Sequence, residues 1–171
     1  MKAEDLKALQ APLKSAYRDN PPSAVITLDA EGVLGEENIS CKVDTGKALV
    51  EAGLHPATGG DGSFACSGDM LLQALVACAG VTLKAVATAL GIELRGGKVR
   101  AEGDLDFRGT LGVDKSAPVG FSDIRLKFQL DSDASEEQLE SLLKLTERYC
   151  VVFQTLKNSP NIKLAPLRKA G

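Results

Sequence analysis

The residues best suited to chemistry are four cysteines, each in a different setting. Cys41 lies among alternating apolar residues, Cys66 follows a glycine-rich loop, Cys78 is in a long apolar run, and Cys150 ends an amphipathic stretch. A thiolate is both a nucleophile and a metal ligand, so redox, hydrolytic and metal chemistry must all be weighed. Metal binding is disfavoured because there is no C-x-x-C pair and the single histidine, His55, cannot complete a usual zinc site alone. We therefore expect no metal site.

The elements that hold these cysteines can be read from the spacing of apolar residues. Alternating residues predict strands, with the first two joined as a hairpin, and a 3.6-residue period predicts helices. The last helix opens where Asp133 and Glu136 fit a variant of the capping box. The expected elements are strands over residues 24–29, 39–44, 98–107, 123–131 and 161–167, the last at a sheet edge, and helices over residues 3–16, 70–92 and 133–150.

This order of strands, helix, strands, helix and strand predicts an α+β fold with antiparallel sheet. The cluster RDNPP, from Arg18 to Pro22, ends the first helix and separates it from the rest of the chain. We therefore expect an N-terminal helical arm over residues 1–22 and a single α+β domain over residues 23–171.

The overall composition narrows the class of protein. The chain has 171 residues, of which 44% are hydrophobic and 25% charged, with a formal net charge of −3. This charge gives no basic surface for nucleic acid. Gln73, Lys84 and Thr88 interrupt the apolar run at 70–92, which indicates a core helix and not a membrane span. The first seventeen residues lack the apolar centre of a signal peptide, so we expect a cytoplasmic protein whose cysteines are reduced.

Each cysteine has a structural and a chemical interpretation. Cys41 alternates with apolar strand residues and fits a small hydrophobic residue. Cys66 either packs the loop or is activated at the start of the long helix. Cys78 is either an inert core thiol or a reactive one. It lies too far from both ends of its own helix for the dipole of that helix to activate it. Cys150 shares the apolar face of the last helix, so it points into the same interior as Cys78. His55, beside a proline, is interpreted as a loop residue and not as the base of a hydrolase.

Two features together are similar to a known family. The segment D-M-L-L-Q-A-L-V-A-C runs from Asp69 to Cys78 after a glycine-rich loop, and Cys150 ends a second helix some seventy residues later. This resembles the osmotically inducible protein C / organic hydroperoxide resistance family, OsmC/Ohr, from about residue 24 to residue 164. The resemblance implies an OsmC-like fold, in which antiparallel β-sheets wrap around two central helices of an intertwined homodimer.

The resemblance also implies an activity. It assigns Cys78 as the peroxidatic thiol and Cys150 as the resolving thiol of a peroxidase that reduces organic hydroperoxides. Asp69 takes the place of the family's acidic residue, and Arg18 is the candidate for its arginine, with Arg148 as a substitute. The substrate is expected to be a small apolar hydroperoxide, and the regenerating partner a dithiol reductant such as a lipoyl group. The alternative is a dimer of the same fold that senses redox state or binds an apolar ligand without turnover, and a third interpretation treats all four cysteines as packing.

Helix geometry limits how Asp69 can serve Cys78. The two residues are nine positions apart, which is about 13.5 Å and two and a half turns of a straight α-helix. Their side chains then point to opposite faces. Either the helix breaks or one of the residues comes from the other subunit. Small residues at Ala74, Ala77 and Gly80 favour the close approach of a second copy, so we predict an obligate homodimer with composite sites.

Overall fold

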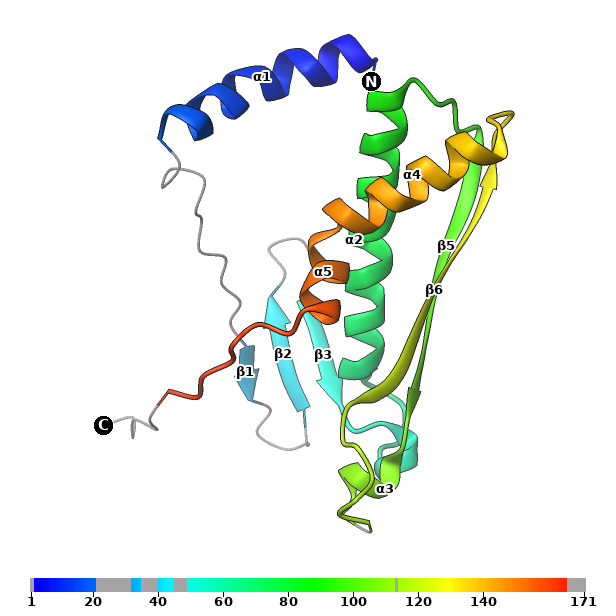
Figure 1. Ribbon diagram of the computed structural model, residues 1–171. Helices are drawn as coiled ribbons and strands as arrows, with labels where there is room; N and C mark the ends of the chain where they lie inside the picture. Colours follow the sequence, from blue (N-terminus) through cyan, green and yellow to red (C-terminus); the bar gives the residue numbers. More distant parts are fainter. Residues whose placement is uncertain (1, 21–31, 35–39, 45–48, 113, 166–171) are drawn as a thin grey trace.

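The computed structural model describes residues 2–20, 32–34, 40–44, 49–112 and 114–165. Two sheets and one long helix organise these residues (Figure 1). Along the chain the elements are α1 (Ala3–Asp19), β1 (Gly32–Leu34), β2 (Ser40–Asp44), β3 (Leu49–Gly53), η2 (Pro56–Thr58), β4 (Ala65–Cys66), α2 (Ser67–Leu90), β5 (Gly96–Leu105), α3 (Phe107–Thr110), β6 (Phe121–Asp131), α4 (Glu136–Tyr149) and α5 (Val151–Lys157).

The first sheet has the order β1-β2-β3-β4. Strand β2 confirms the strand expected at 39–44, and it pairs antiparallel with both β1 and β3. The expected strand at 24–29 lies outside the described residues. Three strands were not predicted: β1, β3 and the two-residue β4. The pair β3–β4 is parallel and not antiparallel. Strand β4 leads directly into α2, so the sheet fixes the point at which the long helix begins.

The second sheet is a long antiparallel ribbon of β5 and β6, as predicted. The side chains of Ile124, Leu126, Phe128 and Leu130 pack toward the helices. Charged partners pair on the opposite face, for example Lys127 with Glu102 at 2.6 Å. Strand β5 ends at Leu105 and not at 107, because the Asp106 carboxylate accepts a hydrogen bond from the Arg108 amide at 3.0 Å and caps α3.

Helix α2 is continuous and confirms the helix expected at 70–92. It ends at Gly91, whose φ of 69° is left-handed and therefore suits glycine. One stripe of the helix is buried at i, i+4 spacing and packs against α4, α5 and the β5–β6 ribbon. The buried residues of this stripe are Leu75, Ala79, Leu83 and Ala87.

The other side of α2 is uncovered, and it carries exposed apolar residues beside the polar residues Gln73 and Lys84. Leu71 and Val81 are 38% and 72% exposed, and Ala74 and Ala77 are exposed as well. By length and composition alone α2 could cross a membrane, since an 18-residue window has a mean hydropathy of 1.8, and only 22% of that window is buried. The described part of the chain therefore covers one face of its most apolar helix and leaves the other open.

The N-cap of helix α4 lies two residues later than predicted. Ser135 is the N-cap, and its hydroxyl accepts from the Gln138 amide at 3.3 Å while the Gln138 side chain accepts from the Ser135 amide at 2.9 Å. The capping box predicted at Asp133 and Glu136 is therefore wrong. Asp133 instead forms an ion pair with Arg95, which ties the start of α4 to the β5–β6 ribbon.

The end of the chain differs from the sequence-based expectation. Helix α5 follows α4 after the single residue Cys150 and was not predicted. The edge strand expected over 161–167 is wrong for residues 161–165, which form no regular structure. Ile162 and Leu164 are 80% and 97% exposed there. A strand needs a neighbour for its amide and carbonyl groups, and no described strand pairs with this segment.

Helix α1 confirms the helix expected at residues 3–16 and continues to Asp19. Its first turns share a cavity with Ala89, near the C-terminal end of α2. From there α1 runs away from the rest of the chain (Figure 1). The division into an arm over 1–22 and a domain over 23–171 remains a prediction.

Candidate functional site: a pair of unlike thiols

Cys78 lies in the middle of α2, at the edge of the buried stripe. It is half-buried and packs with the cluster formed by Leu75, Ala79 and Cys150. Its neighbours on the same helix, Ala77 and Val81, are exposed. The thiol therefore lies at the border between the covered and the uncovered face of α2.

Cys150 lies at the junction of two helices. Its amide donates to the Thr146 carbonyl at 2.9 Å and closes α4, and its carbonyl accepts from the Gln154 amide at 2.9 Å and opens α5. Its backbone is extended, with φ −73° and ψ 108°, so the two helices meet at a bend. The residue is only 1% exposed, as expected for the core-facing position predicted from the sequence.

The two predicted thiols are brought together. Burial acts to raise the pKa of the Cys78 thiol, but the Val152 amide, the Cys150 thiol and the Val151 amide outweigh it. Together with a smaller contribution from the Thr82 hydroxyl, they place the pKa of Cys78 below its ordinary value. Hydrogen bonds to a charged form stabilise that form.

The pKa of Cys150 moves the other way. Burial raises it, and the neighbouring Cys78 thiolate raises it further, because two negative charges repel each other at short range. The Cys78 sulfur is therefore the first of the pair to ionise, while Cys150 keeps its proton and donates it toward Cys78. The site contains one nucleophilic thiol and one neutral thiol in contact.

The signal that activates Cys78 was missed by the sequence analysis. No end of α2 is near Cys78, and the analysis considered only that helix. The amides that act on it belong to the first turn of α5, a separate helix of seven residues. The bend at Cys150, which turns this first turn toward α2, has no glycine or proline to mark it in the sequence.

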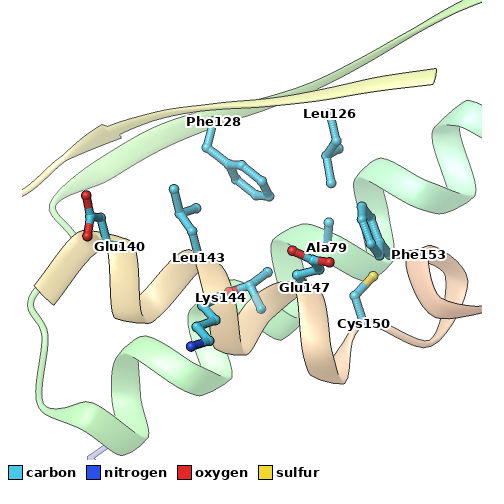
Figure 2. A pocket seen from close by; sticks show the side chains of 10 residues that line it. Ala79, Leu126, Phe128, Glu140, Leu143, Lys144, Glu147, Cys150 and Phe153 are labelled. Atoms are coloured by element: carbon cyan, nitrogen blue, oxygen red, sulfur yellow. The ribbon is translucent and has the colours of Figure 1, made fainter. Parts of the chain in front are cut away.

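A cavity of about 420 Å³ opens beside Cys150 (Figure 2). Leu126 and Phe128 reach into it from β6, and Phe153 and Cys150 close its inner end. Charged residues of α4 lie at its rim. The full lining consists of Ala79, Leu126, Phe128, Glu140, Leu143, Lys144, Thr146, Glu147, Cys150 and Phe153.

Asp69 is not part of this arrangement within one chain. It lies in the first turn of α2 and lines a separate cavity of about 370 Å³ together with His55 and Cys66. His55 stacks on Phe107 with ring centroids 5.0 Å apart, which agrees with its interpretation as a loop residue. Because α2 is continuous from Ser67 to Leu90, the alternative of a broken helix is removed.

The candidate arginine is also separated from the thiols. Arg18 belongs to the end of α1 that points away from α2 (Figure 1), and its side chain lies outside the described residues. The substitute, Arg148, lies over the Tyr149 ring at 5.7 Å and lines a different surface hollow. Arg95, Arg108 and Arg125 are each paired with carboxylates of the ribbon or of α3. The described chain thus supplies the thiols of the predicted site without its cation.

Two further points concern metals and the remaining cysteine. Among the described residues, no three His, Cys, Asp or Glu side chains gather as ligands for a metal ion. The backbone of Cys41 lies in β2, opposite Leu34 and Ala52, and the side chains of that strand lie outside the described residues.

Comparison with known proteins agrees with this architecture. The sequence profile of the OsmC-like protein family matches residues 60–165, the part of the chain that holds α2, the ribbon, α4 and α5. No curated protein matches the chain.

Solved structures show the same fold. An OsmC-like protein from Mycoplasma pneumoniae is similar with a TM-score of 0.65 and 20% identity, over 78% of this chain and 89% of that one. An organic hydroperoxide resistance protein OsmC from Legionella pneumophila gives 0.62 and 13%, over 78% and 93%. The organic hydroperoxide resistance protein OhrB of Bacillus subtilis gives 0.54 and 16%, over 77% and 93%. The family match covers more than half of the sequence, and these neighbours share its arrangement of helices and strands: the chain belongs to the family of OsmC-like proteins.

Proposed function

We propose that this protein is a thiol-dependent peroxidase that reduces organic hydroperoxides. The observation that carries the proposal is the contact between two unlike thiols, one with a lowered and one with a raised pKa. Two cysteines that only fill space in the core would need no such difference in pKa. The neighbours from Legionella pneumophila and Bacillus subtilis are both named organic hydroperoxide resistance proteins, which supports the same activity.

The proposed cycle begins at Cys78. Its thiolate attacks the outer peroxide oxygen, the O–O bond breaks, an alcohol leaves after protonation, and Cys78 becomes a sulfenic acid. The Cys150 sulfur then attacks the Cys78 sulfur, water leaves, and a Cys78–Cys150 disulfide forms. The contact between the thiols makes this second step fast relative to overoxidation. No cofactor takes part, and a dithiol must reduce the disulfide to complete the cycle.

The surroundings of Cys78 favour an apolar substrate. Ala77 and Val81 are exposed beside it, and Leu75 lies below it in the core. An alkyl or aryl hydroperoxide loses its contact with water on such a surface, which favours its binding by about 25 cal/mol for each Å² of apolar area covered. Hydrogen peroxide has no apolar group and gains nothing there.

The site is completed, in this proposal, by a second copy of the chain. Thiolate formation alone accelerates peroxide reduction only modestly, and a fixed cation is needed to orient the peroxide and stabilise the leaving alkoxide. Asp69 and Arg18 are far from Cys78 within one chain, and the uncovered apolar face of α2 runs past Cys78. A homodimer that pairs these faces would cover them and bring charged groups of one subunit to the thiol of the other. The cytosol, where thiols are kept reduced, is the compartment that suits the cycle.

The test is to add one equivalent of cumene hydroperoxide to the reduced protein and map the products by mass spectrometry. We expect a Cys78–Cys150 linkage, and repeated loss of peroxide when a dithiol is present. In the Cys150→Ser variant, Cys78 should pass from sulfenic to sulfinic acid. A linkage through Cys41 or Cys66 would contradict the assignment of the two thiols.

A second candidate function is a dimer of the same fold that senses redox state or binds an apolar ligand. The cavity of about 420 Å³ beside Cys150 favours it, because its volume falls in the range of small-molecule sites. The two functions differ in stoichiometry. A sensor consumes about one peroxide per chain even with excess dithiol, whereas a peroxidase continues until either substrate is exhausted.

A further inference from the structure

The two thiols of the site are reached from different sides. Among the described residues that line the 420 Å³ cavity, Cys150 is present and Cys78 is not. Cys78 instead borders the uncovered face of α2, next to Ala77 and Val81. A molecule in the cavity therefore meets the sulfur of Cys150, and a molecule on the α2 face meets that of Cys78.

Disulfide chemistry distinguishes the two sulfurs. A thiolate that reduces a Cys78–Cys150 disulfide can attack either sulfur, and the other sulfur then leaves. The thiol with the lower pKa leaves faster. Burial raises the pKa of both thiols. At Cys78 the hydrogen bonds from Val152, Cys150 and Val151 outweigh it and lower the pKa, whereas at Cys150 burial and the Cys78 sulfur outweigh the Phe153 and Val152 amides and raise the pKa. Attack at Cys150, with departure of Cys78, is the faster of the two routes.

We propose that the cavity beside Cys150 is the entrance for the reductant, which forms its mixed disulfide with Cys150 and not with Cys78. This inference rests on the proposed function. The first thiolate of the reductant bonds to the Cys150 sulfur, the Cys78–Cys150 bond breaks, and Cys78 leaves with the electron pair. The second thiol of the reductant then attacks the reductant sulfur that is bonded to Cys150, and the bond to Cys150 breaks. Cys150 takes up a proton, and the reductant leaves as a disulfide. The protein gains two electrons and the dithiol loses two.

The cavity also indicates which kind of thiol enters. Cys150 lines it although the residue is only 1% exposed, so the attacking sulfur must pass inside to reach it. The walls near Cys150 are apolar, from Leu126, Phe128 and Phe153. At the rim, Glu147 is paired with Lys157 at 2.6 Å. Glu140 and Lys144 also line the cavity and carry opposite charges, so these four charges sum to zero. These features suit a thiol on an uncharged apolar chain better than a charged, hydrophilic one.

The position of attack can be measured without peroxide. Diamide is used to form the Cys78–Cys150 disulfide, octanethiol is added briefly, and free thiols are blocked with iodoacetamide before mass mapping. The inference predicts octanethiol on Cys150 and the iodoacetamide label on Cys78. The reverse pattern would overturn it while leaving the peroxidase proposal intact. If diamide forms no such disulfide, the peroxidase proposal fails and this inference fails with it.

A variant at the cavity tests the route. Leu143 lines the cavity and is 37% exposed, so Leu143→Trp should narrow the mouth without disturbing the core. We expect reduction by octanethiol to slow about tenfold relative to oxidation by cumene hydroperoxide, because the thiol is displaced from its line of attack. The matched control is Leu111→Trp, at a residue 55% exposed beyond α3 that does not line the cavity. Equal reduction rates in the two variants, with folding verified by circular dichroism, would contradict the inference.

Discussion

The middle and the head of α2 each hold a cysteine, and they differ in what surrounds it. Cys66, at the head, is the N-cap residue of α2 itself and lies beside Asp69 and His55 in a cavity of about 370 Å³. Cys78, in the middle, is more than a turn from either end of α2, yet the amides of α5 reach it. The comparison teaches that the helix that activates a thiol need not be the helix that carries it.

The two regions also complement each other. The middle of α2 has a pair of thiols in contact, and no described arginine lines the cavity beside them. The head of α2 has Asp69 and Asp104 but a single cysteine. Neither region alone has the parts of a peroxidase site. If two copies of α2 pack along their uncovered faces in opposite directions, the head of one lies near the middle of the other.

The largest expected effect is a difference in peroxidase activity between variants of Cys78 and of Cys66. Cys78→Ser should abolish peroxide turnover, with a loss of about 1,000-fold or more, because a hydroxyl cannot form a sulfenic acid. Its matched control, Cys66→Ser, should stay within about twofold of the wild type. The measurement is steady-state loss of cumene hydroperoxide with excess dithiol. Wild-type turnover in Cys78→Ser would end the peroxidase proposal, and a large loss in Cys66→Ser would move the site to the head of α2.

The second prediction tests whether the two regions meet between chains. In the proposed composite site, Asp69→Ala should lose most of its activity, because the carboxylate that would orient the arginine of that site is gone. When Cys78→Ser and Asp69→Ala chains are unfolded and refolded together, random pairing makes half of the dimers mixed, and each mixed dimer has one complete site. About one-quarter of wild-type activity should return. If no activity returns, each chain forms its own site and Asp69 has no role across the interface.

Much of this architecture followed from the sequence, for identifiable reasons. The long apolar helix, the alternating strand at 123–131 and the contact of Cys78 with Cys150 each depend on a periodic apolar face, and such faces are buried together. The features that were missed depend on contacts between distant segments. Strands β3 and β4 are short and pair with each other across the loop that joins them, and helix α5 follows a bend that no glycine or proline marks. The cap of α4 moved to Ser135 because Asp133 binds Arg95, a partner 38 positions away.

The third prediction concerns the uncovered face of α2. Val81 is 72% exposed and lies one turn from Cys78, so a dimer that covers this face would bury it. Val81→Arg would then place an unpaired charge in an apolar interface, which weakens dimerisation by tenfold or more, since the cost is about 1.4 kcal/mol or above. Sedimentation equilibrium at micromolar concentration measures the change. The control is Val119→Arg, at a residue 65% exposed in the loop before β6, which should sediment like the wild type. A wild-type protein that is already monomeric would refute both this prediction and the shared site.

The smallest expected effect tests the electrostatic difference between the thiols themselves. A thiol with a lowered pKa becomes a thiolate at lower pH, so alkylation of Cys78 by iodoacetamide should reach its half-maximal rate at a lower pH than that of an ordinary cysteine. Cys150, whose pKa is raised, should require a higher pH.

Thr82→Val removes the hydroxyl that contributes least among the groups lowering the pKa of Cys78, so the alkylation profile of Cys78 should move toward higher pH. At neutral pH the alkylation rate of Cys78 should then fall about twofold. Thr88→Val is the matched control, because the Thr88 hydroxyl donates to the Lys84 carbonyl at 2.8 Å on the same helix and is not among the groups that act on Cys78. An equal shift in both variants would mean that the substitution acts through the helix and not through a hydrogen bond to the Cys78 sulfur.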